Sequence, residues 1–155
     1  MNIDYNELTK FLNVANKATY ANSNAPKADS LRPSSEDYHF EQGDLIYHDT
    51  YFGARDFIGE EIVYKAGTPL WGMNYYGHVL NPAVSTKDAY AILRPALMQE
   101  YHDILPVRGP REYIEGNSRY TNKVEGTLDR FSGEEHIYLN DELIYKCWYH
   151  GGSIE

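Results

Sequence analysis

Apolar residues recur at helical spacing in two stretches of the chain. The first stripe is Leu8, Phe11, Leu12 and Ala15. Asp4 and Glu7 form a capping-box pattern at its start, so we predict a helix over residues 5–17. The second stripe is Ala89, Ile92, Leu93, Ala96 and Leu97, after an N-cap pattern at Ser85. Pro95 lies inside this stripe and is expected to kink the helix or divide it into two short helices.

Six other stretches have the alternation or β-rich composition of strands. They are residues 43–51, 57–65, 70–76, 119–127, 131–139 and 142–150. Ala66-Gly67 and Asn140-Asp141 are predicted hairpin turns. Residues 21–43 are rich in Asn, Ser, Pro and charge, and we expect a long loop there, with disorder over residues 22–35. The order helix, three strands, helix, three strands indicates an α+β fold with an antiparallel sheet.

Two of these strand regions resemble each other in sequence. Residues 57–64 read FIGEEIVY and residues 131–138 read FSGEEHIY. The match continues without a gap, so that Tyr75 falls on Tyr149. We therefore predict two α-β-β-β units, residues 5–77 and 86–151, related by a pseudo-two-fold repeat. They would form a single domain over residues 1–155, with one curved sheet backed by both helices.

The predicted turns give a trial register for the hairpins. With Ala66-Gly67 as the turn, Glu60 lies opposite Met73, and the second hairpin places Glu134 in the equivalent position. Both acids then lie on the more aromatic face of the sheet. A carboxylate in apolar surroundings must be paired, protonated or near water, and such groups often mark functional sites. A slip of one residue would exchange Glu60 for Glu61, and a Glu at a strand edge often simply reaches solvent.

The candidate ligand-binding residues follow from this register and from two loops. They are Glu60, Glu134, Trp71, Tyr75, Tyr145, Tyr149, His150 and Arg108. Arg108 and Arg111 flank Gly109-Pro110, where guanidinium groups could bind an anion or pair with the many acids of the chain. His150 could titrate near neutrality or could simply end a strand at the surface.

The charge and the cysteine content exclude several classes of function. The net charge is −9, with 23 acidic and 14 basic residues, which argues against nucleic acids and anionic membranes as partners. The single cysteine, Cys147, allows no intrachain disulfide. Residues 1–12 lack the pattern of a signal peptide, and no apolar stretch is long enough to span a membrane. We therefore expect a cytoplasmic protein. The six histidines are scattered and no Gly-rich phosphate loop is present. We therefore expect no metal and no cofactor.

Four short motifs together resemble a known family. They are residues 49–53 (DTYFG), 71–77 (WGMNYYG), 108–110 (RGP) and 149–152 (YHGG). The chain resembles, from about Phe11 to its end, a bacterial and archaeal domain of unknown function that in some proteins follows an XRE-type helix-turn-helix. That position would imply a sensor or regulatory role. Residues 1–43 of this chain are too short and too acidic for a complete DNA-binding module.

Three functions are compatible with the sequence. The first is a module that binds a small molecule in an aromatic groove, with Glu60 and Glu134 as polar anchors that favour a cationic or hydrogen-bond-donating ligand. The second is a small hydrolase or isomerase that uses Glu60 or Glu134 with His150 or Asp49. The third is an interaction domain that forms a homodimer through its tyrosine-rich face. We favour the binding module over the enzyme.

Overall fold

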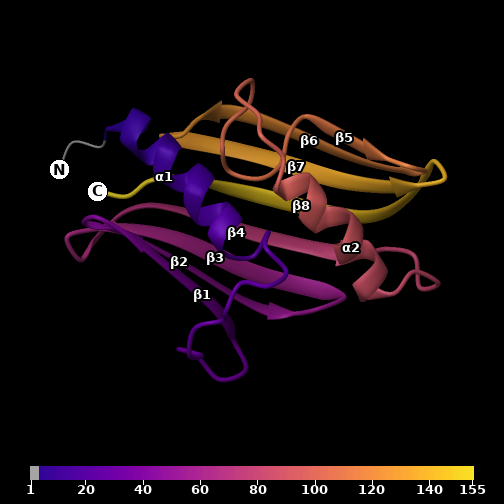
Figure 1. The fold of residues 1–155 in the computed structure, drawn as a ribbon, viewed down its shortest axis with the longest axis horizontal. Coiled ribbons are helices and arrows are strands. Elements are labelled where there is room, and N and C mark those ends of the chain that lie inside the picture. The colour runs from indigo at the N-terminus through magenta and orange to yellow at the C-terminus, as the bar shows by residue number, and fades with distance from the viewer. Residues whose placement is uncertain (1–3) are drawn as a thin grey trace.

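The fold is an eight-stranded antiparallel sheet with two helices, as the computed structural model of residues 4–155 shows (Figure 1). The first group of elements is α1 (Tyr5–Ala18), β1 (Glu36–Gln42), β2 (Leu45–Gly53), β3 (Asp56–Lys65) and β4 (Thr68–Val79). The second group is α2 (Thr86–Leu97), β5 (Glu112–Glu115), β6 (Ser118–Thr127), β7 (Arg130–Leu139) and β8 (Glu142–Ser153). The predicted α+β class with a curved antiparallel sheet and two helices is confirmed.

The strand order is β1-β2-β3-β4-β8-β7-β6-β5. Each group of four consecutive strands is a meander, and the two meanders join where β4 pairs with β8 at the middle of the sheet, with Tyr75 opposite Tyr149. Both helices lie on the same face of the sheet, α1 against β1 and β2 and α2 against β6 and β7 (Figure 1). We call this covered face the inner face and the opposite one the outer face.

Three predictions about the elements were wrong. Residues 36–42 form the edge strand β1 instead of loop, and residues 112–115 form the other edge, β5. Edge strands carry polar residues because one side meets water, so β1 shows little alternation. The expected disorder of residues 22–35 is absent, since Ala28 donates a backbone hydrogen bond to Asp37 and Ser35 caps the preceding turn at Arg32. Helix α2 runs continuously through Pro95, so it is not divided into two short helices.

Both long hairpins contain a β-bulge, and the bulges overturn the predicted register. The register shifts between Val63 and Tyr64 in the first hairpin and between Ile137 and Tyr138 in the second. Each bulge inserts one extra residue, so that beyond it the side chains lie on the opposite face of the sheet from the predicted one. Glu61, rather than Glu60, therefore lies on the same face as Trp71 and Met73, and in the second hairpin Glu135 rather than Glu134 lies beside Cys147.

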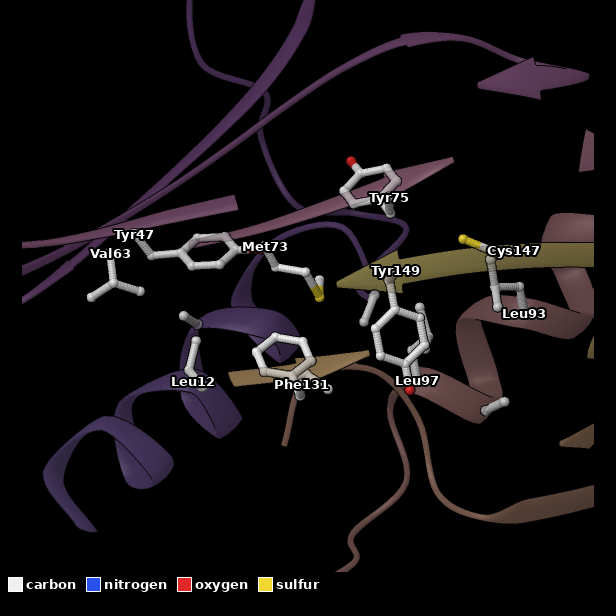
Figure 2. Close-up of a cluster of buried hydrophobic side chains, with 14 of the residues drawn as sticks. Leu12, Tyr47, Val63, Met73, Tyr75, Leu93, Leu97, Phe131, Cys147 and Tyr149 are labelled. Atoms are coloured by element: carbon white, nitrogen blue, oxygen red, sulfur yellow. The ribbon is translucent and has the colours of Figure 1, made fainter. Parts of the chain in front are cut away.

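The core lies between the inner face and the two helices. Leu12 of α1 and Leu93 and Leu97 of α2 approach the aromatic residues of the sheet from the same side (Figure 2). Trp71 is fully buried, stacks on Phe131, and donates its indole N–H to the carbonyl of Leu128 at 3.0 Å. Within residues 4–155, neither helix combines the length and the apolar character that a membrane span requires.

Candidate functional site

A buried arginine occupies the centre of the inner face. Arg108 Nη2 donates to Glu135 Oε1 at 2.5 Å, and both side chains are buried. Glu135 also accepts from the hydroxyls of Tyr120, at 2.6 Å, and Tyr145, at 2.8 Å. Burial alone would lower the pKa of Arg108, but the charge and hydrogen bond of Glu135, together with the nearby Cys147 and Tyr145, outweigh it and hold the pKa above its ordinary value. The guanidinium therefore stays charged and Glu135 is its counter-ion.

The loop that carries Arg108 is fixed by hydrogen bonds to β6. The amide of Gly109 donates to the Tyr120 hydroxyl at 3.1 Å, and Asn122 Nδ2 donates to the Gly109 carbonyl at 2.8 Å. A Cβ at position 109 would overlap the Tyr120 ring, so glycine is required for this close approach. The Arg-Gly-Pro motif thus places its arginine inside the protein, where it pairs with acids.

Glu61 lies on the other side of Arg108 and is poorly satisfied. Its Oε1 is 3.9 Å from Arg108 Nη1, while its buried Oε2 and the buried Nε of Arg108 have no hydrogen-bond partner. Both residues border a cavity of about 20 Å³, enough for about one water molecule. Burial and the nearby Asp49 raise the pKa of Glu61 to about 8. Glu61 is therefore mostly protonated at neutral pH.

Asp49 is the third buried acid of the inner face. It lies opposite Glu61 in the β2–β3 register and accepts from the Tyr75 hydroxyl at 2.7 Å. Burial raises the pKa of Asp49 to about 7, although the hydrogen bond from Tyr75 and the charge of Arg108 partly oppose this shift. Burial also raises the pKa of Tyr75 well above its ordinary value, so the hydroxyl keeps its proton and remains a donor. An acid that titrates near neutrality is suited to binding or to proton transfer.

Asp49 borders a cavity of about 230 Å³ between the sheet and α2. Five tyrosines line it, and we call it the tyrosine cavity: Tyr20, Tyr51, Tyr75, Tyr90 and Tyr145. Phe57 and Leu93 add apolar wall, and Ala54 in the β2–β3 turn also lines it. Aromatic walls with a few polar groups are typical of sites for small organic molecules.

Two further cations line the tyrosine cavity. Lys27 pairs with Glu36 at 2.6 Å, and both of these side chains also line the cavity. Arg94 of α2 stacks on the Tyr20 ring, with its guanidinium carbon 4.6 Å from the ring centroid. Among residues 4–155, Arg94 has no carboxylate within ion-pair distance.

The structure separates the predicted site residues into three groups. Tyr75, Tyr145 and Arg108 line the tyrosine cavity. Trp71 and Tyr149 are buried in the core but line none of the main cavities described here. Glu60, Glu134 and His150 lie on the outer face, so the predicted groove that joined them to the aromatic residues was wrong.

The exposure of the glutamates shows the effect of the bulges most directly. The side chains of Glu60 and Glu134 are each 39% exposed and pair with Arg32 and Lys146. The side chains of Glu61 and Glu135 are only 5% and 0% exposed. Glu60 also borders a separate hollow on the outer face, beside Asp37 and His48.

The register prediction missed the inward positions of Glu61 and Glu135. Sequence reasoning also missed Arg94 and three of the cavity tyrosines, Tyr20, Tyr51 and Tyr90. A signal for the bulge was present, because Leu70-Trp71 and Ile144-Tyr145 are adjacent apolar pairs in otherwise alternating strands. Two consecutive buried residues of this kind are typical of a bulge. No local signal placed Arg94 beside Tyr20. Across residues 4–155, no cluster of three or more His, Cys, Asp or Glu side chains could hold a metal ion.

The family comparison covers most of this site. Residues 49–154 match the family described as domain of unknown function DUF5680, which is more than half of the chain, so the chain belongs to this family. The match includes Asp49, Glu61, Arg108 and Glu135, whereas Tyr20 and the Lys27–Glu36 pair lie before it. Neither the curated proteins nor the solved structures contain a significant match to the chain.

Proposed function

We propose that the protein is a sensor-type domain that binds a small organic molecule in the tyrosine cavity. The observation that carries this proposal is the combination, in one cavity of about 230 Å³, of aromatic walls with a buried acid, Asp49. Burying a carboxyl group costs stability unless it is well paired. An apolar residue at position 49 would avoid this cost, so the presence of an acid beside an open cavity favours a role in binding.

A fragment screen against a cavity-filling variant tests the proposal. Ala54 is exposed at the turn that lines the cavity, and Ala54→Trp should occupy the entrance without disturbing the core. Ala83→Trp is the matched control, because Ala83 is also exposed but lines none of the cavities described here. We expect ligand-detected NMR to identify fragments whose binding falls at least about tenfold in Ala54→Trp and persists in Ala83→Trp. A screen in which no fragment shows this dependence would contradict the proposal.

The second candidate function is acid–base catalysis, and the pKa of Asp49 favours it. A general acid or base works best when its pKa lies near the operating pH, and that of Asp49 is raised to about 7. Glu60, Glu134 and His150 lie on the outer face, so a hydrolase or isomerase would have to use Asp49 with Tyr75. Asp49→Asn distinguishes the two functions. If it abolishes conversion of a bound fragment while binding persists, the enzyme is supported; if no bound fragment is ever converted, the binding module is.

A homodimer through the tyrosine-rich face finds no support in the arrangement of these residues. Tyr75, Tyr145 and Tyr149 are buried beneath the helices, so they offer no surface to a second copy. A dimer would have to use the edges or the outer face of the sheet. Sedimentation at several protein concentrations tests whether one forms.

We further infer that the two halves of the sheet are an internal repeat within a single domain. The same order of one helix and four strands in each half, the equivalent bulges, and the pairs Glu61/Glu135 and Tyr75/Tyr149 support this inference. The net charge of −9 and the lone cysteine still favour a cytoplasmic protein without nucleic-acid or membrane partners.

A further inference from the structure

The charged groups around the tyrosine cavity do not cancel. Lys27 is neutralised by Glu36 and Arg108 by Glu135, at 2.6 and 2.5 Å. The two charged groups that remain are Asp49 and Arg94. Asp49 accepts a hydrogen bond from Tyr75 and has a pKa raised to about 7 by burial, so at neutral pH it is protonated in a large share of molecules. Arg94 is charged at every physiological pH, which leaves an excess of positive charge.

Arg94 is also oriented for an anion. Its guanidinium lies over the face of the Tyr20 ring, and among residues 4–155 its planar fork of N–H donors has no carboxylate within ion-pair distance. Those donors suit the two oxygens of a carboxylate, which a guanidinium binds through paired hydrogen bonds. Stacking also restricts the side chain before a ligand arrives, so less conformational entropy is lost on binding.

The size and walls of the cavity limit the rest of the ligand. A volume of about 230 Å³ lies below the range of roughly 300–1,000 Å³ that is typical of drug-sized sites, so the ligand must be small. The rings of Tyr51, Tyr90 and Phe57 form flat apolar walls. A single aromatic ring or a body of similar size would be in contact with them.

We propose that the tyrosine cavity takes a small aromatic monoanion, such as an aryl carboxylate, whose anionic group binds Arg94. This inference rests on the proposed binding function and reverses the preference for a cationic ligand that the sequence suggested. The reversal has a structural cause, because Glu60 and Glu134 lie on the outer face and the acids near the cavity are paired or partly protonated. Asp49, when protonated, adds a hydrogen-bond donor.

Three probes with one shared body test the charge of the ligand. Phenylacetate, phenylacetamide and phenethylamine carry the same ring with an anionic, a neutral and a cationic group. We expect NMR titrations at neutral pH to show phenylacetate binding at least about tenfold more tightly than either of the others. Tighter binding of the amine or of the amide, or no binding of phenylacetate, would overturn the assignment.

Variants of Arg94 test whether that residue causes the preference for an anionic ligand. Arg94→Gln should abolish the preference for phenylacetate and leave the affinity for phenylacetamide unchanged, which also shows that the cavity is intact. Arg94→Lys should keep part of the preference, because the charge remains but the planar fork is lost. Arg130→Gln makes the same change of net charge at an exposed position that does not line the cavity, and should have no effect. A preference that survives Arg94→Gln would contradict the proposal.

The fragment screen separates this inference from the function on which it rests. If the fragments whose binding is weakened by Ala54→Trp are neutral or cationic, the charge assignment fails and the binding function stands. If no fragment depends on Ala54, the binding function itself fails.

Discussion

The two halves of the sheet place equivalent acids in unequal surroundings. Glu135 in the second half accepts hydrogen bonds from Arg108, Tyr120 and Tyr145. Glu61 occupies the corresponding position in the first half, but Arg108 is 3.9 Å away and Oε2 has no partner. Arg108 is a single side chain between two acids, and its short ion pair is with Glu135.

The neighbouring pair shows the same difference. In the second half the Tyr149 hydroxyl donates to Asn122 at 2.6 Å, an amide that carries no charge. In the first half the Tyr75 hydroxyl donates to Asp49. The two hydroxyls point away from each other from neighbouring positions at the centre of the sheet (Figure 2). The first half thus carries an ionisable group where the second carries a neutral one.

The two halves differ in how well their buried acids are paired. In the second half Glu135 accepts three hydrogen bonds and is fully paired, as members of structural networks are. The first half retains two acids with raised pKa values, and one of them borders the tyrosine cavity. Acids with perturbed pKa values cluster at functional sites.

The largest expected effect comes from removing one acid of the Arg108 network. Glu135→Gln leaves the buried Arg108 without its close counter-ion and should lower the free energy of unfolding by about 3–5 kcal/mol. Glu61→Gln removes the poorly paired acid and should change it by less than about 1 kcal/mol. Urea denaturation of both variants at pH 7 measures the contrast. Equal losses would show that the two acids share Arg108 equally, and our distinction between the halves would be wrong.

A smaller contrast is expected at two glycines beneath the tyrosines. A Cβ at Gly59 would overlap the Tyr75 ring and the carbonyl of Thr50, and a Cβ at Gly133 would overlap the Tyr149 ring and the carbonyl of Lys123. Overpacking of this kind costs about 1–3 kcal/mol. Tyr75 borders the tyrosine cavity and can move into it, whereas Tyr149 borders none of the cavities described above.

Gly133→Ala should therefore destabilise the protein more than Gly59→Ala, as judged by thermal melting. Gly59→Ala should in addition weaken fragment binding, because the displaced Tyr75 ring occupies part of the cavity. If Gly59→Ala is the more destabilising change, Tyr75 is held more rigidly than the cavity suggests.

Long-range geometry marks the limit of what could be predicted. The periodicity of Leu8, Phe11 and Leu12 correctly predicted α1, and the Asn140-Asp141 turn correctly predicted the β7–β8 hairpin. These features depend on residues close in the chain. The edge strand β1 could not be predicted in the same way, because edge strands carry polar residues and their composition resembles that of a loop.

The candidate site shows the same limit in a sharper form. Tyr75, Tyr145 and Arg108 were predicted as site residues and do line one cavity. Glu60 and Glu134 were placed on the wrong face because a single bulge residue in each hairpin reverses the side of every residue beyond it. Arg94 depends on how α2 docks over the sheet beside Tyr20, which no local pattern encodes.

The smallest expected effect, and the finest test of the comparison, is the pH dependence of stability in Asp49→Asn. This change gives the first half the amide that the second half has at Asn122, and the amide oxygen can still accept from Tyr75. In the wild type the pKa of Asp49 rises from 3.8 in an unfolded chain to about 7 in the folded protein. Between these values the folded state binds more protons, so the stability contributed by Asp49 is complete below pH 4 and is lost as the pH rises through 7.

Asp49→Asn removes this loss. Relative to the wild type, the variant should gain about 1–2 kcal/mol between pH 5 and pH 8, which is less than the full shift implies because Glu61 titrates beside it. Urea midpoints at both pH values measure the gain, and Asp29→Asn at an exposed position controls for net charge. If the wild type and Asp49→Asn lose stability in parallel, Asp49 is ionised throughout this range. Asp49 would then carry a fixed negative charge beside the tyrosine cavity. This charge would cancel the excess of positive charge assigned to Arg94.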